Sequence, residues 1–122
     1  MDETDLLHLF IVRAPLTLPN VRVFRRNIIN RVATERGRKF QLRNGIKGQC
    51  DAYVLLRGGG HVELETKAAR GTMREAQERW QEFCWAFDIP HLVLRARRGE
   101  TPEETVTRWI DELRTVVETR AA

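Results

Sequence analysis

The stretch from Cys50 to Lys67, CDAYVLLRGGGHVELETK, constrains the fold of this chain more than any other segment. Two runs of alternating apolar and polar residues flank three consecutive glycines, which is typical of two antiparallel strands joined by a tight turn. Successive side chains of a strand point to opposite faces. The pattern therefore predicts a β-hairpin, residues 50–57 and 61–67, with one apolar and one polar face.

The polar face of this hairpin gathers acids and an amine. If the three glycines form the turn, Tyr53 lies opposite Glu65, and Asp51 lies opposite Lys67. Asp51 and Glu65 are then diagonal neighbours, whose Cβ atoms stand roughly 7–8 Å apart. Two carboxylates at that separation can hold one Mg²⁺ ion and leave sites for water and a phosphate oxygen. Lys67 would orient that water or stabilise charge on the phosphate. The arrangement predicts a metal-dependent hydrolytic site.

Two other hypotheses use the same residues. Alternating acids and lysines are common on a solvated antiparallel face, where a cross-strand Asp–Lys pair stabilises the hairpin and does nothing else. His61 and Glu63 also share the face with Glu65, which makes an H-x-E-x-E metal site conceivable. This second hypothesis is the weaker one, because His61 adjoins the turn and lies far from Asp51.

Sequence periodicity predicts three helices outside the hairpin. The spacing of apolar residues predicts a first helix over residues 3–13 that ends before Pro15. Thr72 and Glu75 form a capping-box pattern, which predicts the start of a second helix. The segment TPEE, which begins at Thr101, combines a cap, a proline at the first position and a glutamate at the third. It predicts the start of a third helix.

Other segments have the composition of strands. Residues 21–32 are rich in β-branched side chains, a turn is expected at Gly37 before a strand that runs through Leu42, and residues 92–94 have the character of a buried strand. The order is helix, strands, hairpin, helix, strand, helix. This order predicts an α/β fold, with a short mixed sheet between helices, and a single domain over residues 1–122.

The compartment is inferred from the ends and the cysteines of the chain. No apolar run approaches the roughly 18 residues that span a bilayer. The first residues, MDETDLLHLF, carry acids where a secretory signal carries Lys or Arg. We therefore expect a cytoplasmic protein without a membrane partner, in which Cys50 and Cys84 stay reduced and buried.

Positive charge is concentrated in one segment of the chain. The formal net charge is +4, yet the segment from Arg22 to Lys47 holds nine Lys or Arg residues against the single acid Glu35. A patch of one sign suits a polyanion, and nucleic acid is favoured over a membrane surface because no amphipathic basic helix accompanies the patch. Arg25, Arg26 and Lys47 are the candidate phosphate contacts. The alternative is a solvated surface whose arginines cover apolar area.

The hairpin and its flanks carry an ordered motif. Its residues are Gly48, Asp51, the run Glu65-Thr66-Lys67, Gly71 and Gln77. This set resembles the signature of PD-(D/E)xK nucleases, and in particular the small stand-alone VRR-NUC domains of phages and bacteria. The upstream RVFRRN segment is similar to that family's arginine–asparagine segment. The resemblance covers residues 21–95.

The resemblance implies a restriction-endonuclease-like αβββαβ core and a DNA endonuclease that requires Mg²⁺ or Mn²⁺. It makes Asp51 and Glu65 metal ligands, joined by the backbone carbonyl of Thr66. Lys67 becomes the residue that positions water or stabilises charge, and Gln77 the helical active-site residue. Relatives often add a glutamate from the first helix, for which Glu3 is the candidate here.

The resemblance also implies a biological setting, and two departures accompany it. Stand-alone members are associated with homodimers that cut branched DNA such as Holliday junctions, in the cytoplasm of bacteria or of phage-infected cells. Thr66 replaces the usual apolar residue of E-x-K, and Gln49-Cys50 replaces a usual small or proline pair. Two other functions stay open, namely a non-catalytic DNA-binding module of the same fold and a sequence-specific restriction nuclease.

Overall fold

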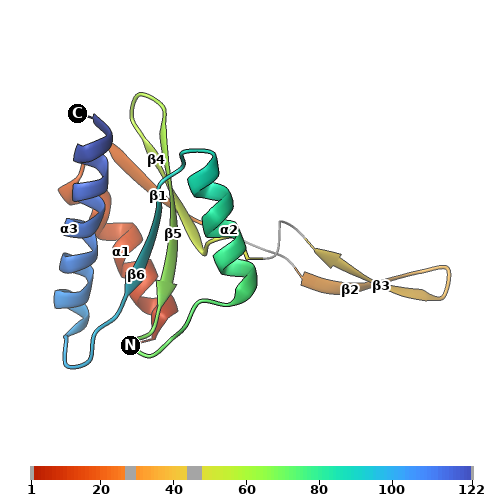
Figure 1. Ribbon diagram of the computed structural model, residues 1–122. Helices are drawn as coiled ribbons and strands as arrows, with labels where there is room; N and C mark the ends of the chain where they lie inside the picture. Colours follow the sequence, from red (N-terminus) through yellow and green to blue (C-terminus); the bar gives the residue numbers. More distant parts are fainter. Residues whose placement is uncertain (1, 27–29, 44–47, 122) are drawn as a thin grey trace.

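The computed structural model describes residues 2–26, 30–43 and 48–121 of the protein, and Figure 1 shows its arrangement. The fold is mixed α/β, as the element order predicts. A four-stranded sheet has the strand order β1-β4-β5-β6, in which β5 and β6 are parallel and the other neighbours antiparallel. The helices are α1 (Glu3–Thr17), α2 (Glu75–Ala86) and α3 (Pro102–Ala121). The strands are β1 (Val21–Arg25), β2 (Asn30–Glu35), β3 (Arg38–Arg43), β4 (Ala52–Leu56), β5 (Gly60–Lys67) and β6 (His91–Arg95).

The hydrophobic core lies between one face of this sheet and the helices α1 and α3 (Figure 1). Four side chains of β4 and β5 are fully buried on this face, namely Ala52, Val54, Val62 and Leu64. Phe10 of α1 meets Trp109 of α3 edge-to-face, with ring centroids 6.1 Å apart. The indole N–H of Trp109 donates to the carbonyl of Arg95 at 3.1 Å, which satisfies its polar atom inside the core. Helix α2 lies on the opposite face of the sheet (Figure 1).

The predicted hairpin is present as β4 and β5, but the register predicted for it is wrong. Tyr53 lies opposite Glu63 and not opposite Glu65. The cause is the turn: Gly58 and Gly59 take positive φ angles of 94° and 106°, whereas the third glycine already belongs to β5. The shift equals two residues, so every side chain keeps the face that the alternation assigned to it.

Two helix boundaries differ from the sequence expectation. Helix α1 continues through Pro15 and ends at Thr17, because a proline in the last turn removes only one backbone donor. Helix α2 begins at Glu75, so the predicted capping box of Thr72 with Glu75 is wrong. The carboxamide of Gln77 takes that role, and its oxygen accepts the amide N–H of Arg74 at 2.9 Å.

The predicted start of α3 is confirmed. The amide of Glu104 donates to the hydroxyl of Thr101, and the amide of Thr101 donates to the carboxylate of Glu104, both at 3.2 Å. This reciprocal pair is a capping box. Among the helices in the described ranges, none is long and apolar enough to cross a membrane.

Strands β2 and β3 form a separate two-stranded ribbon that projects from the body of the molecule (Figure 1). The extended segment predicted over residues 21–32 is therefore two strands in two different sheets. The turn predicted at Gly37 is confirmed, since Arg36 and Gly37 take φ angles of 50° and 76°. Arg36, Arg38 and Lys39 are exposed at this end of the ribbon.

Candidate active site

Four separate segments bring the predicted site residues together at one end of the sheet. Asp51 precedes β4, Glu65 to Lys67 end β5, Gln77 lies in the first turn of α2, and Glu3 lies in the first turn of α1. The carboxylate of Glu3 accepts the amide N–H of Ala68 at 2.8 Å, directly after β5. The catalytic set proposed from the sequence is thus a spatial cluster.

Gln77 joins the lysine and the glutamate of this cluster. Its carbonyl oxygen accepts from Nζ of Lys67 at 2.8 Å, and its amide nitrogen donates to Oε1 of Glu65 at 3.0 Å. Nζ of Lys67 lies 4.0 Å from the same oxygen of Glu65. The first turn of α2 therefore fixes both side chains, and a change at Gln77 disturbs the helix start together with the site.

Asp51 is oriented by Thr66, which occupies the middle position of the E-x-K run. Oδ2 of Asp51 accepts the amide N–H of Thr66 at 3.1 Å and its hydroxyl at 3.0 Å. An apolar residue at position 66 would supply only the first of these two bonds. The hydroxyl of Thr66 therefore adds a second anchor to the carboxylate of Asp51.

Glu65 is a buried acid with an unsatisfied oxygen. Its side chain is 2% exposed, and Oε2 has no hydrogen-bond partner among the described residues. Burial raises the pKa of Glu65 to about 8, assisted by the charge of neighbouring Asp51 and opposed by Lys67. Buried polar atoms normally have partners, and a buried charge requires a counter-charge. The site therefore favours a proton or a cation between the two carboxyl groups.

Few side-chain donors among the described residues are available to a metal ion at this position. The part of the chain that the structure describes contains no group of three or more His, Cys, Asp or Glu side chains arranged to hold one. Mg²⁺ is commonly bound through one or two carboxylates and keeps several waters. Asp51, Glu65 and the carbonyl of Thr66 fit that lower requirement, and the unpartnered Oε2 of Glu65 is the observation that favours it.

Gly48 allows the loop before β4 to approach α2. Its φ angle is 91°, and a Cβ at this position would lie 2.1 Å from the carbonyl oxygen of Ala76. Only glycine fits such a contact, because any side chain would overlap the helix backbone. The close approach holds the segment that contains Asp51 against the helix that supplies Gln77.

The three residues predicted to contact phosphates have different environments. Arg25 lines a small polar cleft of about 120 Å³ together with Glu3, Asp51 and Thr66, and its guanidinium lies 3.1 Å from Nε2 of His8. Arg26 is 17% exposed and donates two hydrogen bonds to the carboxylate of Glu63, at 2.7 and 3.0 Å. Lys47 lies outside the described residues. Arg25 and Arg26 both line this cleft beside Asp51, but the guanidinium of Arg26 is paired with Glu63, which leaves Arg25 as the better candidate for a phosphate contact.

Glu63 is a structural residue that sequence reasoning missed. Besides Arg26, its carboxylate accepts the indole N–H of Trp80 at 3.0 Å and lies 2.5 Å from Nε2 of His61. Burial raises the pKa of Glu63, but the hydrogen bonds from Arg26 and His61 outweigh it, and the net shift is downward. Because these partners occupy Glu63, the H-x-E-x-E metal site is not formed. The only sequence signal for the role of Glu63 was its position on the same strand face as residues 61 and 65.

The two cysteines are free and buried, as expected. Burial, followed by the charges of Glu65 and Glu63, raises the pKa of Cys50 far above its ordinary value. Burial and Glu63 raise the pKa of Cys84 to about 11. The raised pKa values favour the protonated thiol of both cysteines near neutrality, which is a weak nucleophile.

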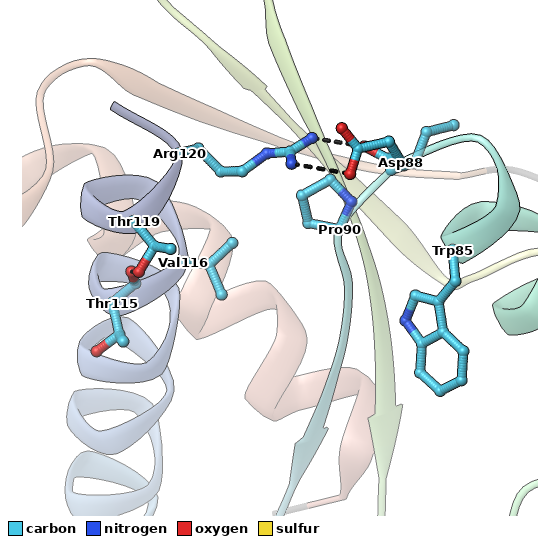
Figure 2. Close-up of a pocket in the computed structure, with 8 residues that line it drawn as sticks. Trp85, Asp88, Pro90, Thr115, Val116, Thr119 and Arg120 are labelled. Carbon is cyan, nitrogen blue, oxygen red and sulfur yellow. Dashed lines mark hydrogen bonds and ion pairs between the residues drawn. The ribbon is translucent and has the colours of Figure 1, made fainter. Parts of the chain in front are cut away.

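A larger cavity of about 320 Å³ lies away from these residues, between the turn that follows α2 and the end of α3 (Figure 2). Trp85, Pro90 and Val116 contribute its apolar surface. Its two charged residues, Asp88 and Arg120, form an ion pair with each other. Because each of these two charges is neutralised by the other, this cavity does not contain an uncompensated acid like the one at Glu65.

A scan of protein-family models finds no match to this chain, and a search of curated proteins finds none.

Proposed function

We propose that this protein is a metal-dependent endonuclease of the PD-(D/E)xK type that hydrolyses DNA phosphodiester bonds. The observation that carries the proposal is the buried Oε2 of Glu65, which has no hydrogen-bond partner in the described chain. The carboxyl group of Asp51 is its charged neighbour. Nζ of Lys67 lies 4.0 Å from Glu65, where its positive charge can stabilise negative charge on a phosphate. The element sequence α1, β1, β4, β5, α2, β6 agrees with a restriction-endonuclease-like αβββαβ core, with the ribbon inserted after the first strand.

Asp51, Glu65 and the carbonyl of Thr66 would hold Mg²⁺ or Mn²⁺. When bound, such an ion lowers the pKa of water and stabilises negative charge on a phosphate. The residues of the chain provide the rest. Gln77 holds the ammonium of Lys67 beside Glu65, where the positive charge stabilises a phosphate as it becomes more negative.

The positive charge of the chain supports DNA as the substrate. The exposed arginines and lysine at the end of the ribbon, Arg36, Arg38 and Lys39, form a cationic tip. A two-stranded β-ribbon fits the major groove of B-DNA, and lysine or arginine contacts with phosphate supply most of the sequence-independent affinity. Arg25 continues this charge into the cleft beside Asp51.

We further propose a homodimer that acts on branched or structured DNA. Two symmetric cuts need two sites, and this chain offers one acidic cluster among its described residues. Two large apolar side chains at the end of α2 are exposed, Trp85 in the helix and Phe87 directly after it, and they offer a contact surface for a second copy.

The proposal is tested by incubating linear, flap, splayed and four-way DNA with the protein in Mg²⁺, Mn²⁺ or EDTA. We expect cleavage with either metal and none in EDTA. Glu65→Gln should abolish cleavage and retain binding, whereas Glu118→Gln, an exposed carboxylate on α3, should behave as the native protein. If Glu65→Gln leaves every activity unchanged, the protein is a DNA-binding module. Cleavage of linear duplex at defined sequences, with no preference for four-way DNA, would instead indicate a restriction nuclease.

A further inference from the structure

A ladder of three stacked rings crosses the face of the sheet that α2 leaves partly open. The ring of Phe24 on β1 stacks on Tyr53 of β4, with centroids 5.5 Å apart and planes inclined by 24°. Tyr53 stacks in turn on His61 of β5 at 5.7 Å and 19°. The ladder ends at Phe24, because β1 is the edge strand of the four-stranded sheet.

Phe24 is also part of an open pocket, which we call the Phe24 pocket. Its volume is about 280 Å³, and its lining residues are Pro19, Asn20, Arg22, Phe24, Leu55, Leu56 and Arg57. Phe24 is 43% exposed and Leu55 45% exposed, so a flat apolar surface is open to solvent. The pocket volume lies near the lower end of the roughly 300–1,000 Å³ range of ligand pockets, which suits one nucleotide.

Two guanidinium groups border this apolar surface. Arg22 donates to the carbonyls of Pro19 and Val21, at 3.0 and 2.7 Å, and Arg57 donates to the side-chain oxygen of Asn20 at 3.1 Å. All of these acceptors are neutral. Within the described residues, neither guanidinium forms an ion pair with a carboxylate, so both positive charges remain uncompensated next to an exposed ring.

The chemistry of the Phe24 pocket matches an unpaired nucleotide. Proteins that bind single strands combine aromatic side chains, on which bases stack, with positive groups that contact the phosphates. A base inside a duplex has both faces covered by its neighbours and cannot stack on Phe24. A peptide of opposite charge would satisfy the arginines, but it would not need a flat aromatic surface between them.

We propose that the Phe24 pocket binds one unpaired base of a single-stranded DNA segment, stacked on Phe24, with the adjoining phosphates contacted by Arg22 and Arg57. This inference rests on the proposed nuclease function in taking DNA as the ligand, and it specifies the substrate as one with unpaired nucleotides. Phe24 lies opposite Tyr53, which is two residues from Asp51. A strand rises about 3.3 Å per residue, so the pocket begins roughly 7 Å from Asp51 along the strand.

The test measures DNA binding in EDTA, where no cleavage occurs, by fluorescence anisotropy of a labelled oligothymidine and of a blunt duplex. Phe24→Leu retains apolar bulk but removes the ring, and it should weaken oligothymidine binding by about 5- to 150-fold with little change for the duplex. Phe24→Trp should retain the affinity. Leu16→Ala removes an exposed apolar side chain from α1, outside the lining of the Phe24 pocket, and should have no effect on either ligand. Thermal unfolding of each variant verifies that the fold is retained.

Two further measurements separate stacking from charge. An oligonucleotide with abasic sites should bind the native protein and Phe24→Leu equally. Arg57→Gln should reduce the slope of the logarithm of affinity against the logarithm of salt concentration by about 0.7 for a single strand. Native affinity for oligothymidine in Phe24→Leu, or equal losses for oligothymidine and duplex, would overturn the inference.

The inference and the nuclease proposal can fail separately. If Phe24→Leu loses single-strand binding but the native protein cleaves no DNA with any metal, the pocket stands and the nuclease proposal fails. If the native protein cleaves DNA and Phe24→Leu binds oligothymidine as the native protein does, the nuclease proposal stands and the pocket fails.

Discussion

Replacing Glu65 by glutamine should stabilise the metal-free protein at neutral and alkaline pH, although it removes the acid on which the proposed chemistry depends. Oε2 of Glu65 is buried without a hydrogen-bond partner in the described chain, and Asp51 is its charged neighbour. In the variant, the carboxamide oxygen of residue 65 can still accept from Gln77, and its new NH₂ group can donate to Asp51. Above the pKa of Glu65, an electrostatic repulsion is thereby exchanged for a hydrogen bond, and below that pKa the variant no longer depends on a retained proton.

The magnitude follows from the pKa of Glu65, which burial and Asp51 raise from 4.5 to about 8. Between these values the folded protein retains a proton that the unfolded chain has released. The free energy of unfolding therefore falls as pH rises, by about 1.4 kcal/mol per pH unit for this group, and levels off above pH 8. From pH 5 to pH 8 the loss is on the order of 4 kcal/mol. For a chain of this size it corresponds to a difference in Tm on the order of 10 °C.

The assay is urea unfolding in EDTA across this pH range, followed by tryptophan fluorescence. The difference in free energy of unfolding between Glu65→Gln and the native protein should grow from pH 5 to pH 8. Glu118→Gln, the exposed control on α3, should show no such growth. Added Mg²⁺ should stabilise the native protein more than the variant. A difference that stays constant with pH would refute the argument that Glu65 is held protonated beside Asp51.

Four other outcomes are expected. Gly48→Ala should cost several kcal/mol of unfolding free energy in urea, because its Cβ overlaps the backbone of α2, whereas Gly99→Ala, with a similar φ but open space, should cost only about 1–2 kcal/mol. Arg108→Met should raise the pKa of Glu100 from about 2 towards 4.5 in an NMR titration, since the hydrogen bond from Arg108 is the main cause of the low value. Thr66→Val should reduce Mg²⁺-dependent cleavage by roughly 10- to 100-fold, while Thr66→Ser retains it. Sedimentation on four-way DNA at micromolar concentration should show a dimer, and a monomer would contradict the proposed assembly.

The features predictable from the sequence are those decided over a few neighbouring residues. Alternation in the hairpin fixed which side chains share a face, and the TPEE segment fixed the start of α3 at Thr101. The acids and the lysine of the cluster belong to the same alternating pattern. Short-range geometry decides each of these features, so a pattern of residue types is sufficient to find them.

Features decided by distant partners were not predictable in this way. The sequence pattern predicted Thr72 with Glu75 as the capping pair of α2, whereas Gln77 takes that role because Lys67 and Glu65 hold its side chain from β5. Arg25 and Arg26 look equivalent in sequence and both line the cleft at Asp51, but only the guanidinium of Arg26, just after β1, meets the buried Glu63. The register of the hairpin depended on which two glycines of three took positive φ angles.

The ribbon leaves and rejoins the main sheet at neighbouring points, and this has a consequence for how such a chain can diversify. The amide of Arg26, at the end of β1, donates to the carbonyl of Asp51, just before β4, at 2.8 Å. This hydrogen bond joins the chain segments before and after the ribbon, whatever sequence lies between them. Doubling the length of such a loop costs only about 0.6 kcal/mol of closure entropy. A segment of another length or charge can therefore replace the β2–β3 ribbon at this position while the acidic cluster stays intact.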